Sequence, residues 1–314
     1  MNAPPAVGRN RLLWTQLPEH LREAVAAAAG AEVVAAASQP GGFSPGLASV
    51  LRLAGGGSVF VKAVSRARNA DSVRMHRQET RVLAALPATV PAPRLLWSYD
   101  DGEWVALMTE ALDGANPAQP WRAHELDAFL TTAGRLVDVL TPSPIPARPI
   151  EEYCRDDLNG WRSLAADPDL AGRLDPWAWR HLERLAVVEA RWPAAAAGTS
   201  LLHGDLRADN VILTGAGAVV VDWPSVCVGA GWVDLLLAVP SLVMQGAGDP
   251  GRLWRDYPPA RVADPDAVTT MLVAAAGYFT HRSLLPAGPE FPTLRAFQRA
   301  QGEAALAWLR QRGW

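Results

Sequence analysis

Short apolar segments separated by glycine- and proline-rich turns fill the first third of the chain. Segments of this kind, rich in β-branched residues, predict the strands of an antiparallel sheet. We expect five strands, at residues 33–38, 50–53, 58–64, 94–99 and 103–109. Alternation along the third strand puts Val59, Val61 and Ala63 on one face of the sheet and Lys62 on the other.

A helix is predicted after the third strand, over residues 71–86, because Pro87 cannot continue it. Its apolar stripe, at a spacing of three and four residues, consists of Met75, Val82, Leu83 and Leu86. Glu79 falls on the same stripe, and a carboxylate on a buried face needs a cationic partner. Lys62, on the preceding strand, is the partner that we favour. The alternatives are a surface position for Glu79 or an ion pair with a neighbouring arginine.

The rest of the chain has helical periodicity. Helices are predicted at residues 126–140, 176–191, 231–245, 266–285 and 293–312. Residues 110–114 lie between the strands and the helices and indicate a hinge. The sequence therefore predicts an α+β protein of two lobes. The N-terminal lobe, residues 1–112, holds a five-stranded antiparallel sheet with one main helix, and the larger lobe, residues 113–314, is mostly helical.

Composition narrows the class of protein. Of the 314 residues, 49% are hydrophobic and 19% are charged, as in globular rather than disordered proteins. A formal net charge of −3 argues against nucleic acid as the main partner. No apolar run is long enough to span a membrane, and residues 1–14 do not have the pattern of a signal peptide. Because Cys154 and Cys227 suit free thiols better than a disulfide, we expect a cytoplasmic protein.

Lysine usage singles out one position. Lys62 is the only lysine among 29 basic residues. Arginine bias, which often follows a GC-rich coding sequence, explains the arginines but not this exception. Lysine carries a compact ammonium and arginine a planar fork, so a site that needs a point charge between phosphates and a carboxylate resists the exchange. Chance retention is the alternative.

The most informative stretch is residues 203–222. It begins with His-Gly-Asp-Leu-Arg-Ala-Asp-Asn and ends, after an apolar run, with Val-Val-Val-Asp. Asn210 lies five residues after Asp205, and Asp222 lies twelve residues after Asn210. This spacing matches the acceptor-orienting loop and the metal-binding strand of a phosphoryl-transfer site. A polar turn next to a strand is the alternative, but it leaves unexplained why Asp222 ends the next apolar strand.

The order of these parts is specific. A glycine-containing loop, the strand with Lys62, the helix with Glu79, the hinge, HGDLRADN at 203–210 and VVVDW at 219–223 follow one another. In this order the chain resembles the aminoglycoside phosphotransferase family, relatives of the protein kinases, over about residues 30–310. His-Gly-Asp, in place of the His-Arg-Asp of protein kinases, points to the branch that phosphorylates small molecules. The resemblance implies a bilobal protein-kinase-like fold.

The resemblance also implies a role for each motif residue. Asp205 would be the catalytic residue, because it accepts a hydrogen bond from the acceptor hydroxyl and aligns it with the γ-phosphate of ATP. Asn210 and Asp222 would bind Mg²⁺ through their side-chain oxygens. Lys62 would neutralise phosphate charge, and Glu79 would hold Lys62 in place.

Further roles fall on residues around this centre. His203 would brace the loop, and Asp234 would do so from the start of a helix. In the loop at residues 41–46, Gly42 and Ser44 would contact the triphosphate; a hairpin turn without a ligand is the alternative. The backbone of Glu110 and Leu112 would bind the edge of the base. The sequence does not define these backbone contacts, so it does not distinguish ATP from GTP as the nucleotide.

The implied acceptor is a hydroxyl group of a small molecule, with no nucleic-acid or membrane partner. It could be an aminoglycoside, a macrolide, a peptide antibiotic or an ordinary metabolite. Residues 240–314 contain eight arginines and six acids, which does not favour a polycationic aminoglycoside, although Asp249, Asp256, Asp264 and Asp266 could still gather near the acceptor. Candidate pocket walls are Trp254, Tyr257, Tyr278 and His281.

Two other functions remain open from the sequence. The same fold could serve as a catalytically inactive nucleotide-binding scaffold. The metal site could instead cleave a phosphate ester. The sequence does not indicate the oligomeric state.

Overall fold

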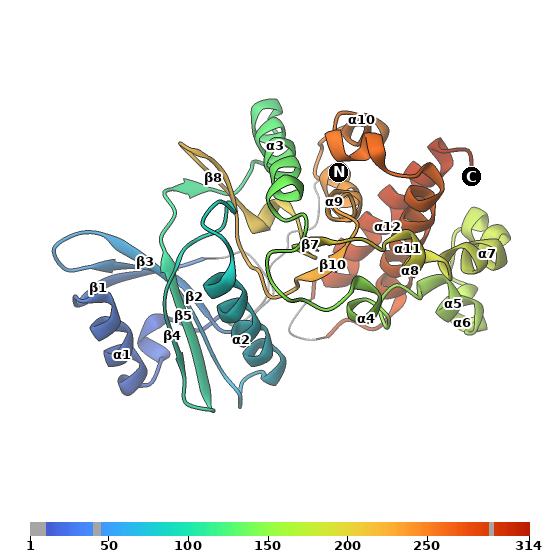
Figure 1. Ribbon diagram of the computed structural model, residues 1–314. Coiled ribbons are helices and arrows are strands. Elements are labelled where there is room, and N and C mark those ends of the chain that lie inside the picture. Colours follow the sequence, from blue (N-terminus) through green and yellow to red (C-terminus); the bar gives the residue numbers. More distant parts are fainter. Residues whose placement is uncertain (1–10, 40–44, 289–291) are drawn as a thin grey trace.

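The computed structural model describes residues 11–39, 45–288 and 292–314. It consists of a sheet-rich lobe, formed by the first part of the chain, and a helical lobe, formed by the rest (Figure 1). The predicted α+β organisation is confirmed. The two lobes meet at the segments that carry the motif residues, so the fold is described here in terms of how it places them.

A five-stranded antiparallel sheet forms the N-terminal lobe. Its strands are β1 (Val33–Ser38), β2 (Leu47–Leu53), β3 (Ser58–Ser65), β4 (Leu95–Asp100) and β5 (Trp104–Glu110). Their order across the sheet is β1-β2-β3-β5-β4. Lys62 therefore lies on the central strand, opposite Ala48 of β2 and Leu107 of β5. Hydrogen-bonded neighbours on both sides fix the position of its backbone.

One helix covers each face of this sheet. These helices are α1 (Glu19–Ala29), which follows a 3-10 helix (Trp14–Gln16), and α2 (Ala70–Ala85). Leu21 of α1 belongs to the same apolar cluster as Val61 of β3. Val73 of α2 packs with Val64, on the opposite face. Successive residues of a strand alternate between faces, so Lys62 shares the α2 face with Val64, as the sequence predicts.

The buried face of α2 differs from the predicted stripe at its first position. The buried residues of the helix are Ser72, Val73, His76, Glu79, Val82 and Leu83. Met75 is 45% exposed, so its place in the predicted stripe was wrong. Helical spacing identifies residues that share a face, but tertiary structure decides what packs against each turn of it. Glu79 is buried, as predicted.

Ten helices are assigned in the described part of the C-terminal lobe. They are α3 (Ala123–Val139), α4 (Ile150–Tyr153), α5 (Gly160–Ala165), α6 (Pro168–Ala171), α7 (Pro176–Glu189), α8 (Trp192–Ala195), α9 (Val233–Met244), α10 (Pro250–Arg255), α11 (Pro265–Leu284) and α12 (Leu294–Gln311). Two 3-10 helices, Ala208–Asn210 and Pro258–Val262, lie between them. The five long helices were predicted, whereas α4, α5, α6, α8 and α10 are too short to give a periodic signal.

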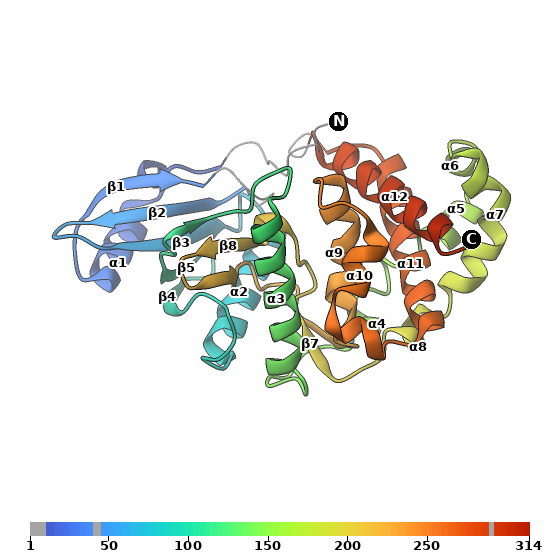
Figure 2. The same cartoon turned by 90° about the horizontal axis from the view of Figure 1, so that it is seen from above.

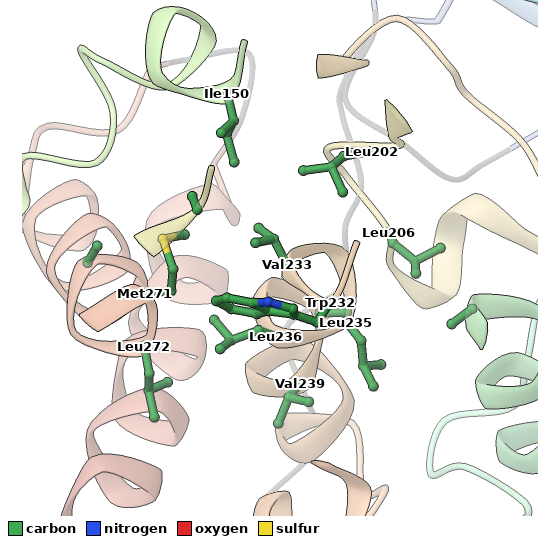
Figure 3. Close-up of a cluster of buried hydrophobic side chains, with 14 of the residues drawn as sticks. Ile150, Leu202, Leu206, Trp232, Val233, Leu235, Leu236, Val239, Met271 and Leu272 are labelled. Carbon is green, nitrogen blue, oxygen red and sulfur yellow. The ribbon is translucent and has the colours of Figure 1, made fainter. Parts of the chain in front are cut away.

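The core of this lobe surrounds α9 and α11. Helix α11 packs against α5, α7, α8, α9 and α12. In Figure 3 the indole of Trp232, just before α9, lies among side chains of α9 and of α11, with Met271 close to it. Cys154 and Cys227 are free thiols. Within the described ranges, no helix combines the length and the apolarity that a membrane-spanning segment requires.

Two small sheets anchor the motif loops. One contains β6 (Gly114–Ala115), β8 (Val211–Thr214) and β9 (Gly217–Val220), and the other contains β7 (Ser200–Leu202) and β10 (Cys227–Gly229). The loop at 203–210 therefore runs from β7 to β8, and the loop at 221–226 runs from β9 to β10. Because the strands pair at both ends, the two loops are held next to each other. In Figure 2, β8 and α3 lie between the sheet and the helical core.

Candidate active site

An ammonium and two carboxylates join the two lobes. Lys62 Nζ donates to Glu79 Oε1 at 2.8 Å and to Glu79 Oε2 at 2.9 Å. It also donates to Asp222 Oδ1 at 2.9 Å. Asp222 is 160 residues away in sequence and belongs to the C-terminal lobe. All three ammonium hydrogens are therefore engaged. The predicted pairing of Glu79 with Lys62 is confirmed.

The opposite charges of Lys62 and the two carboxylates shift the pKa values in the direction that keeps the lysine and Asp222 ionised. Burial would lower the pKa of Lys62, but the carboxylates of Asp222 and Glu79 raise it, so the lysine stays an ammonium. Burial would raise the pKa of Asp222, but attraction to Lys62 and their hydrogen bond lower it to about 2. Burial raises the pKa of Glu79, and Lys62 opposes that rise. Side-chain exposure differs: Glu79 is 3% exposed and Asp222 is 41% exposed.

Local backbone geometry presents Asp222 to the lysine. Strand β9 ends at Val220, two residues earlier than the sequence pattern suggests. Asp222 has φ +68°, in the left-handed region that residues with a side chain rarely occupy. The next residue stabilises this turn, because the indole of Trp223 is fully buried and donates to the Val220 carbonyl at 2.8 Å. The backbone N–H of Trp223 donates to the Glu79 carboxylate, which ties the turn to α2.

The loop before β8 is held from inside the C-terminal lobe. Asp234, in the first turn of α9, accepts hydrogen bonds from the backbone N–H of His203 at 2.7 Å and of Gly204 at 2.9 Å. A side chain at Gly204 would be strained, because its φ is +79° and a Cβ there would lie 2.2 Å from the Ser225 carbonyl oxygen. These contacts give Asp234 the bracing position expected for it.

His203 is a structural member of the same loop. It is fully buried, and burial lowers the pKa of its imidazole, which is therefore neutral. The N–H of Asp205 donates to His203 Nδ1 at 3.3 Å, so Nε2 carries the proton and donates to the Val221 carbonyl at 3.1 Å. The ring also packs edge-on against Trp223, with 4.7 Å between centroids. His203 thus links the loop of Asp205 to the turn of Asp222.

Asp205 lies between an amide and a guanidinium. Asn210 Nδ2 donates to Asp205 Oδ2 at 3.1 Å and to the Asp205 carbonyl at 2.8 Å. Arg207 Nε lies 3.1 Å from Asp205 Oδ1. Burial raises the pKa of Asp205 to about 6, and Arg207 opposes this rise while Asp209 and Asp222 add to it. The side chain is 42% exposed, so an acceptor can reach the carboxylate.

The residues expected to hold a metal present suitable donors. Both Nδ2 hydrogens of Asn210 point to Asp205, which leaves Asn210 Oδ1 with no hydrogen bond to another described residue. Asp222 uses only Oδ1 for Lys62. The backbone N–H of Val221 donates to the Asn210 carbonyl at 2.9 Å, so the two candidate ligands come from adjacent backbone segments. Oxygen donors of this kind fit Mg²⁺.

Among the residues that the structure describes, no three His, Cys, Asp or Glu side chains form a group that could bind a metal ion by themselves. A magnesium ion that is bound with a nucleotide does not need such a group, because phosphate oxygens and water complete its octahedral coordination.

Four other residues were predicted to contact the nucleotide: Gly42, Ser44, Glu110 and Leu112. Gly42 and Ser44 lie outside the described residues. The N–H of Glu110 is engaged with the Arg94 carbonyl at 3.1 Å, and its carboxylate accepts from the Arg94 N–H at 2.9 Å. Because its backbone N–H is already engaged, Glu110 does not offer that group to a base, contrary to the sequence prediction. The backbone groups of Leu112 form no hydrogen bond with other described residues, so they are open to a ligand.

Three further residues belong to this region and were not selected from the sequence. Phe60 lies on the Lys62 face of β3, opposite Thr109 of β5, and strand alternation could have identified it. Arg207 lies within the HGDLRADN motif, next to the predicted catalytic carboxylate. Asn116 donates to the carbonyls of Asp209 at 3.1 Å and Val211 at 2.9 Å, and no local pattern indicates this long-range contact.

Solved structures share this architecture. A thermostable variant of the aminoglycoside phosphotransferase APH(4)-Ia, in a ternary complex with ADP and hygromycin B, matches with a TM-score of 0.60 at 13% identity, over 94% of this chain and 99% of that one. A putative fructosamine-3-kinase from Haemophilus somnus 129PT matches with a TM-score of 0.56 at 16% identity, over 90% and 96%. A choline kinase from Cryptosporidium parvum Iowa II matches with a TM-score of 0.55 at 10% identity, over 96% and 93%. At these identities the likeness establishes the protein-kinase-like fold and nothing finer.

Sequence comparisons identify the family. No curated protein matches the chain. Among protein-family models, the one described as the phosphotransferase enzyme family, APH, matches residues 42–284. The match runs from the glycine-containing loop to the end of α11, and thus includes Lys62, Glu79 and the motif at 203–222. With most of its length in this match and the fold of the small-molecule kinases, the chain belongs to the aminoglycoside phosphotransferase family of phosphotransferase enzymes.

Proposed function

We propose that this protein transfers the γ-phosphate of ATP, or of GTP, to a hydroxyl group of a small molecule. The observation that carries the proposal is the shared ammonium of Lys62, which binds Glu79 of one lobe and Asp222 of the other. Asp205 and Asn210 lie in the adjacent loop, which the buried ring of His203 links to the turn of Asp222. A cation for phosphate, oxygen donors for a metal and an exposed carboxylate for the acceptor thus occur together, as phosphoryl transfer requires.

The chemistry assigned to Asp205 is positioning and proton acceptance. The acceptor oxygen forms a bond to the γ-phosphorus while the bond from that phosphorus to the β–γ bridging oxygen breaks, and ADP leaves with the bonding electrons. The hydroxyl proton passes to an oxygen of Asp205. Asn210 and Arg207 fix the orientation of that carboxylate, because each contacts a different oxygen of it.

The nucleotide belongs on the Lys62 side, with lobe 1–112 contributing most of its contacts. Since all three ammonium hydrogens of Lys62 are engaged, a phosphate has to replace one partner. Asp222 is far more exposed than Glu79, so we expect Asp222 to be exchanged. Asn210 and Asp222 would hold Mg²⁺, which would neutralise charge on the phosphate oxygens. The base would lie against Phe60 and bind the open backbone of Leu112.

The acceptor lies on the side of lobe 113–314. Solved relatives of this fold include proteins that are named for aminoglycosides, fructosamine and choline. These acceptors share a hydroxyl and little else, so the fold supports a small-molecule alcohol and does not select an antibiotic. Dependence on ATP favours the cytoplasm as the place where the protein works.

The proposal is tested by incubating the protein with labelled ATP, Mg²⁺ and a library of antibiotics and hydroxylated metabolites, with products identified by mass. We expect one class of alcohol to gain a phosphate. Nucleotide binding, measured by calorimetry, is recorded in parallel. Binding without transfer to any alcohol would favour an inactive scaffold, and phosphate release from esters without nucleotide binding would favour a hydrolase.

A further inference from the structure

The charge of Asp205 acts on two tyrosines of the C-terminal lobe, Tyr153 and Tyr278. Burial raises the pKa of Tyr278 to about 12, and the carboxylates of Asp157 and Asp205 add to this rise. Burial also raises the pKa of Tyr153; a hydrogen bond with Ser225 opposes that rise and the nearby charge of Asp205 adds to it. Both phenols therefore stay protonated and sense the charge of Asp205. Tyr278 lies on α11, whereas Tyr153 ends α4.

Beyond Tyr278, this surface becomes cationic. Arg282 lies one helical turn further along α11, and its guanidinium is 5.7 Å from the centre of the Tyr278 ring. Arg295, in the first turn of α12, reaches back to the segment after α11, because its Nε donates to the Pro286 carbonyl at 3.1 Å. Burial lowers the pKa of Arg295, and repulsion by Arg282 lowers it further. The first turn of α12 lies close to Asp205, because the guanidinium of Arg207, which contacts Asp205, is 5.6 Å from the centre of the Phe297 ring.

The two arginines differ in how their charge is balanced. Arg282 forms an ion pair with Asp157. Arg295 donates to a carbonyl oxygen and to Gln298 Oε1 at 2.8 Å, and neither of these acceptors carries a charge. No carboxylate of the described residues forms an ion pair with Arg295. The guanidinium of Arg295 is thus the one on this surface whose charge a ligand could balance.

The carboxylates whose charge acts on Tyr278, those of Asp157 and Asp205, are already paired with arginines. Asp205 and Asp209 contact Arg207, and Asp157 contacts Arg282. Of the four acids that the sequence offered for an acidic acceptor site, Asp249 and Asp264 cap α10 and α11, Asp256 pairs with Arg252, and Asp266 forms no ion pair with another described residue. Beside Tyr278, an acceptor with several ammonium groups would therefore meet carboxylates that are already paired, and Arg295 would repel it.

We propose that the acceptor of this enzyme is an alcohol with a negatively charged group, a carboxylate or a phosphate, which binds Arg295 beside Arg282 while the reacting hydroxyl contacts Asp205. A guanidinium fork recognises both groups through two parallel hydrogen bonds. Tyr278 lies between the two ends of the ligand and would contact its carbon chain. This inference rests on the proposed kinase function, because that function assigns the acceptor to Asp205.

The test uses four six-carbon polyols that differ only in the group at C1: gluconate, glucitol 1-phosphate, glucitol and glucamine. Each is titrated calorimetrically into the protein in the presence of a non-hydrolysable ATP analogue, and each is also offered as an acceptor with ATP. We expect an acidic polyol to bind about tenfold or more tightly than glucitol, and glucamine to bind least. The ratio of the affinities for gluconate and glucitol 1-phosphate distinguishes a carboxylate from a phosphate site.

Variants of α12 separate a direct role of Arg295 from a general effect of charge. Arg295→Gln should raise the Kd and the KM for the acidic polyol about tenfold and leave the values for glucitol and the nucleotide unchanged. Arg295→Glu should move the preference toward glucamine. Arg299→Gln is the matched control, because Arg299 is an exposed arginine one turn further along the same helix.

The outcomes separate the two proposals. Equal binding of the acids and glucitol, tightest binding of glucamine, or an Arg295→Gln variant with unchanged affinity for the acids would overturn the anionic acceptor. Binding of the acids through Arg295 without phosphate transfer from ATP to any alcohol would instead uphold the anion site and overturn the kinase assignment.

Discussion

The two sides of the candidate site are built by different means. On the proposed nucleotide side, Lys62 forms ion pairs with Glu79 and Asp222, and its Nζ lies 2.8–2.9 Å from each carboxylate oxygen that it contacts. On the side where we propose that the acceptor binds, Tyr278 and Arg282 lie at the end of one helix, and Arg295 lies at the start of the next. Glu79 is held by backbone and side-chain donors, whereas Arg295 has only uncharged partners.

This difference indicates which side can vary between relatives. A buried ion pair loses several kcal/mol when one partner is removed, because the remaining charge stays buried. The nucleotide side therefore tolerates little change. Side chains at the partly exposed ends of α11 and α12 can change at small cost to folding, so different acceptors can be accommodated there. Substitutions on the two sides should accordingly have different kinetic signatures.

The largest effect is expected for Asp205→Asn. An amide has nearly the shape of the carboxylate but cannot accept the hydroxyl proton, so kcat should fall by on the order of 10²–10⁴-fold. Nucleotide affinity, measured by calorimetry, should change little, because Asp205 contacts neither Lys62 nor Glu79 in the described structure. Full activity of Asp205→Asn would remove Asp205 from the reaction.

Lys62→Ala should reduce kcat/KM for the nucleotide by roughly 10²–10³-fold, because a donor to the phosphates is lost. Lys62→Arg is the second variant, and it tests whether charge alone is sufficient. It keeps the charge but replaces a point donor by a planar fork, so we expect it to recover stability more than activity. Thermal unfolding of both variants separates the two effects. An unchanged rate in Lys62→Ala would mean that the nucleotide binds elsewhere.

The residues that meet at Lys62 and Asp205 could be selected from the sequence, whereas their roles toward a nucleotide stay predictions. Lys62, Glu79, Asp205, Asn210 and Asp222 lie in local patterns whose order is characteristic, and the strands and long helices around them follow from periodicity. Contacts that depend on tertiary packing were not readable. Helical spacing placed Met75 on the buried face although 45% of it is exposed, and it gave no sign that Trp254 and Tyr257, proposed as pocket walls, are buried in the helical core.

The acceptor side illustrates the same limit. The excess of arginine near the C-terminus is visible in the sequence, but the ion pairs of these arginines are not. The ion pair of Arg282 with Asp157, for example, joins residues that are 125 positions apart. Which arginine remains unbalanced depends on every such pair. Asn116, which binds the loop of Asp205 from the segment after the hinge, was missed for the same reason.

A smaller effect, on stability, is expected for Asp234→Asn. The two carboxylate oxygens of Asp234 each accept a different backbone N–H, from His203 and from Gly204. In asparagine one of these oxygens becomes an NH₂ group that faces a donor, so the free energy of unfolding should fall by about 1–3 kcal/mol. Asp264→Asn is the control, because a single oxygen of Asp264 accepts both of its N–H bonds and asparagine caps a helix equally well. Equal losses in the two variants, measured by denaturant titration, would contradict a specific brace.

The smallest effect is expected for Phe60, the one aromatic residue that β3 places on the face of Lys62. If its ring lies against the base of the nucleotide, Phe60→Ala should raise the KM for ATP by several-fold, since an aromatic contact contributes about 0.5–1.5 kcal/mol beyond burial. Phe60→Leu keeps an apolar side chain of similar volume without the π-face, so it should show most of the loss if stacking is the cause and little if burial is. The acceptor KM should not change in either variant, because Phe60 belongs to the sheet, whereas the proposed acceptor site is in the helical lobe. A rise in the KM for the acceptor alone would mean that Phe60 belongs to the acceptor side and not to the nucleotide side.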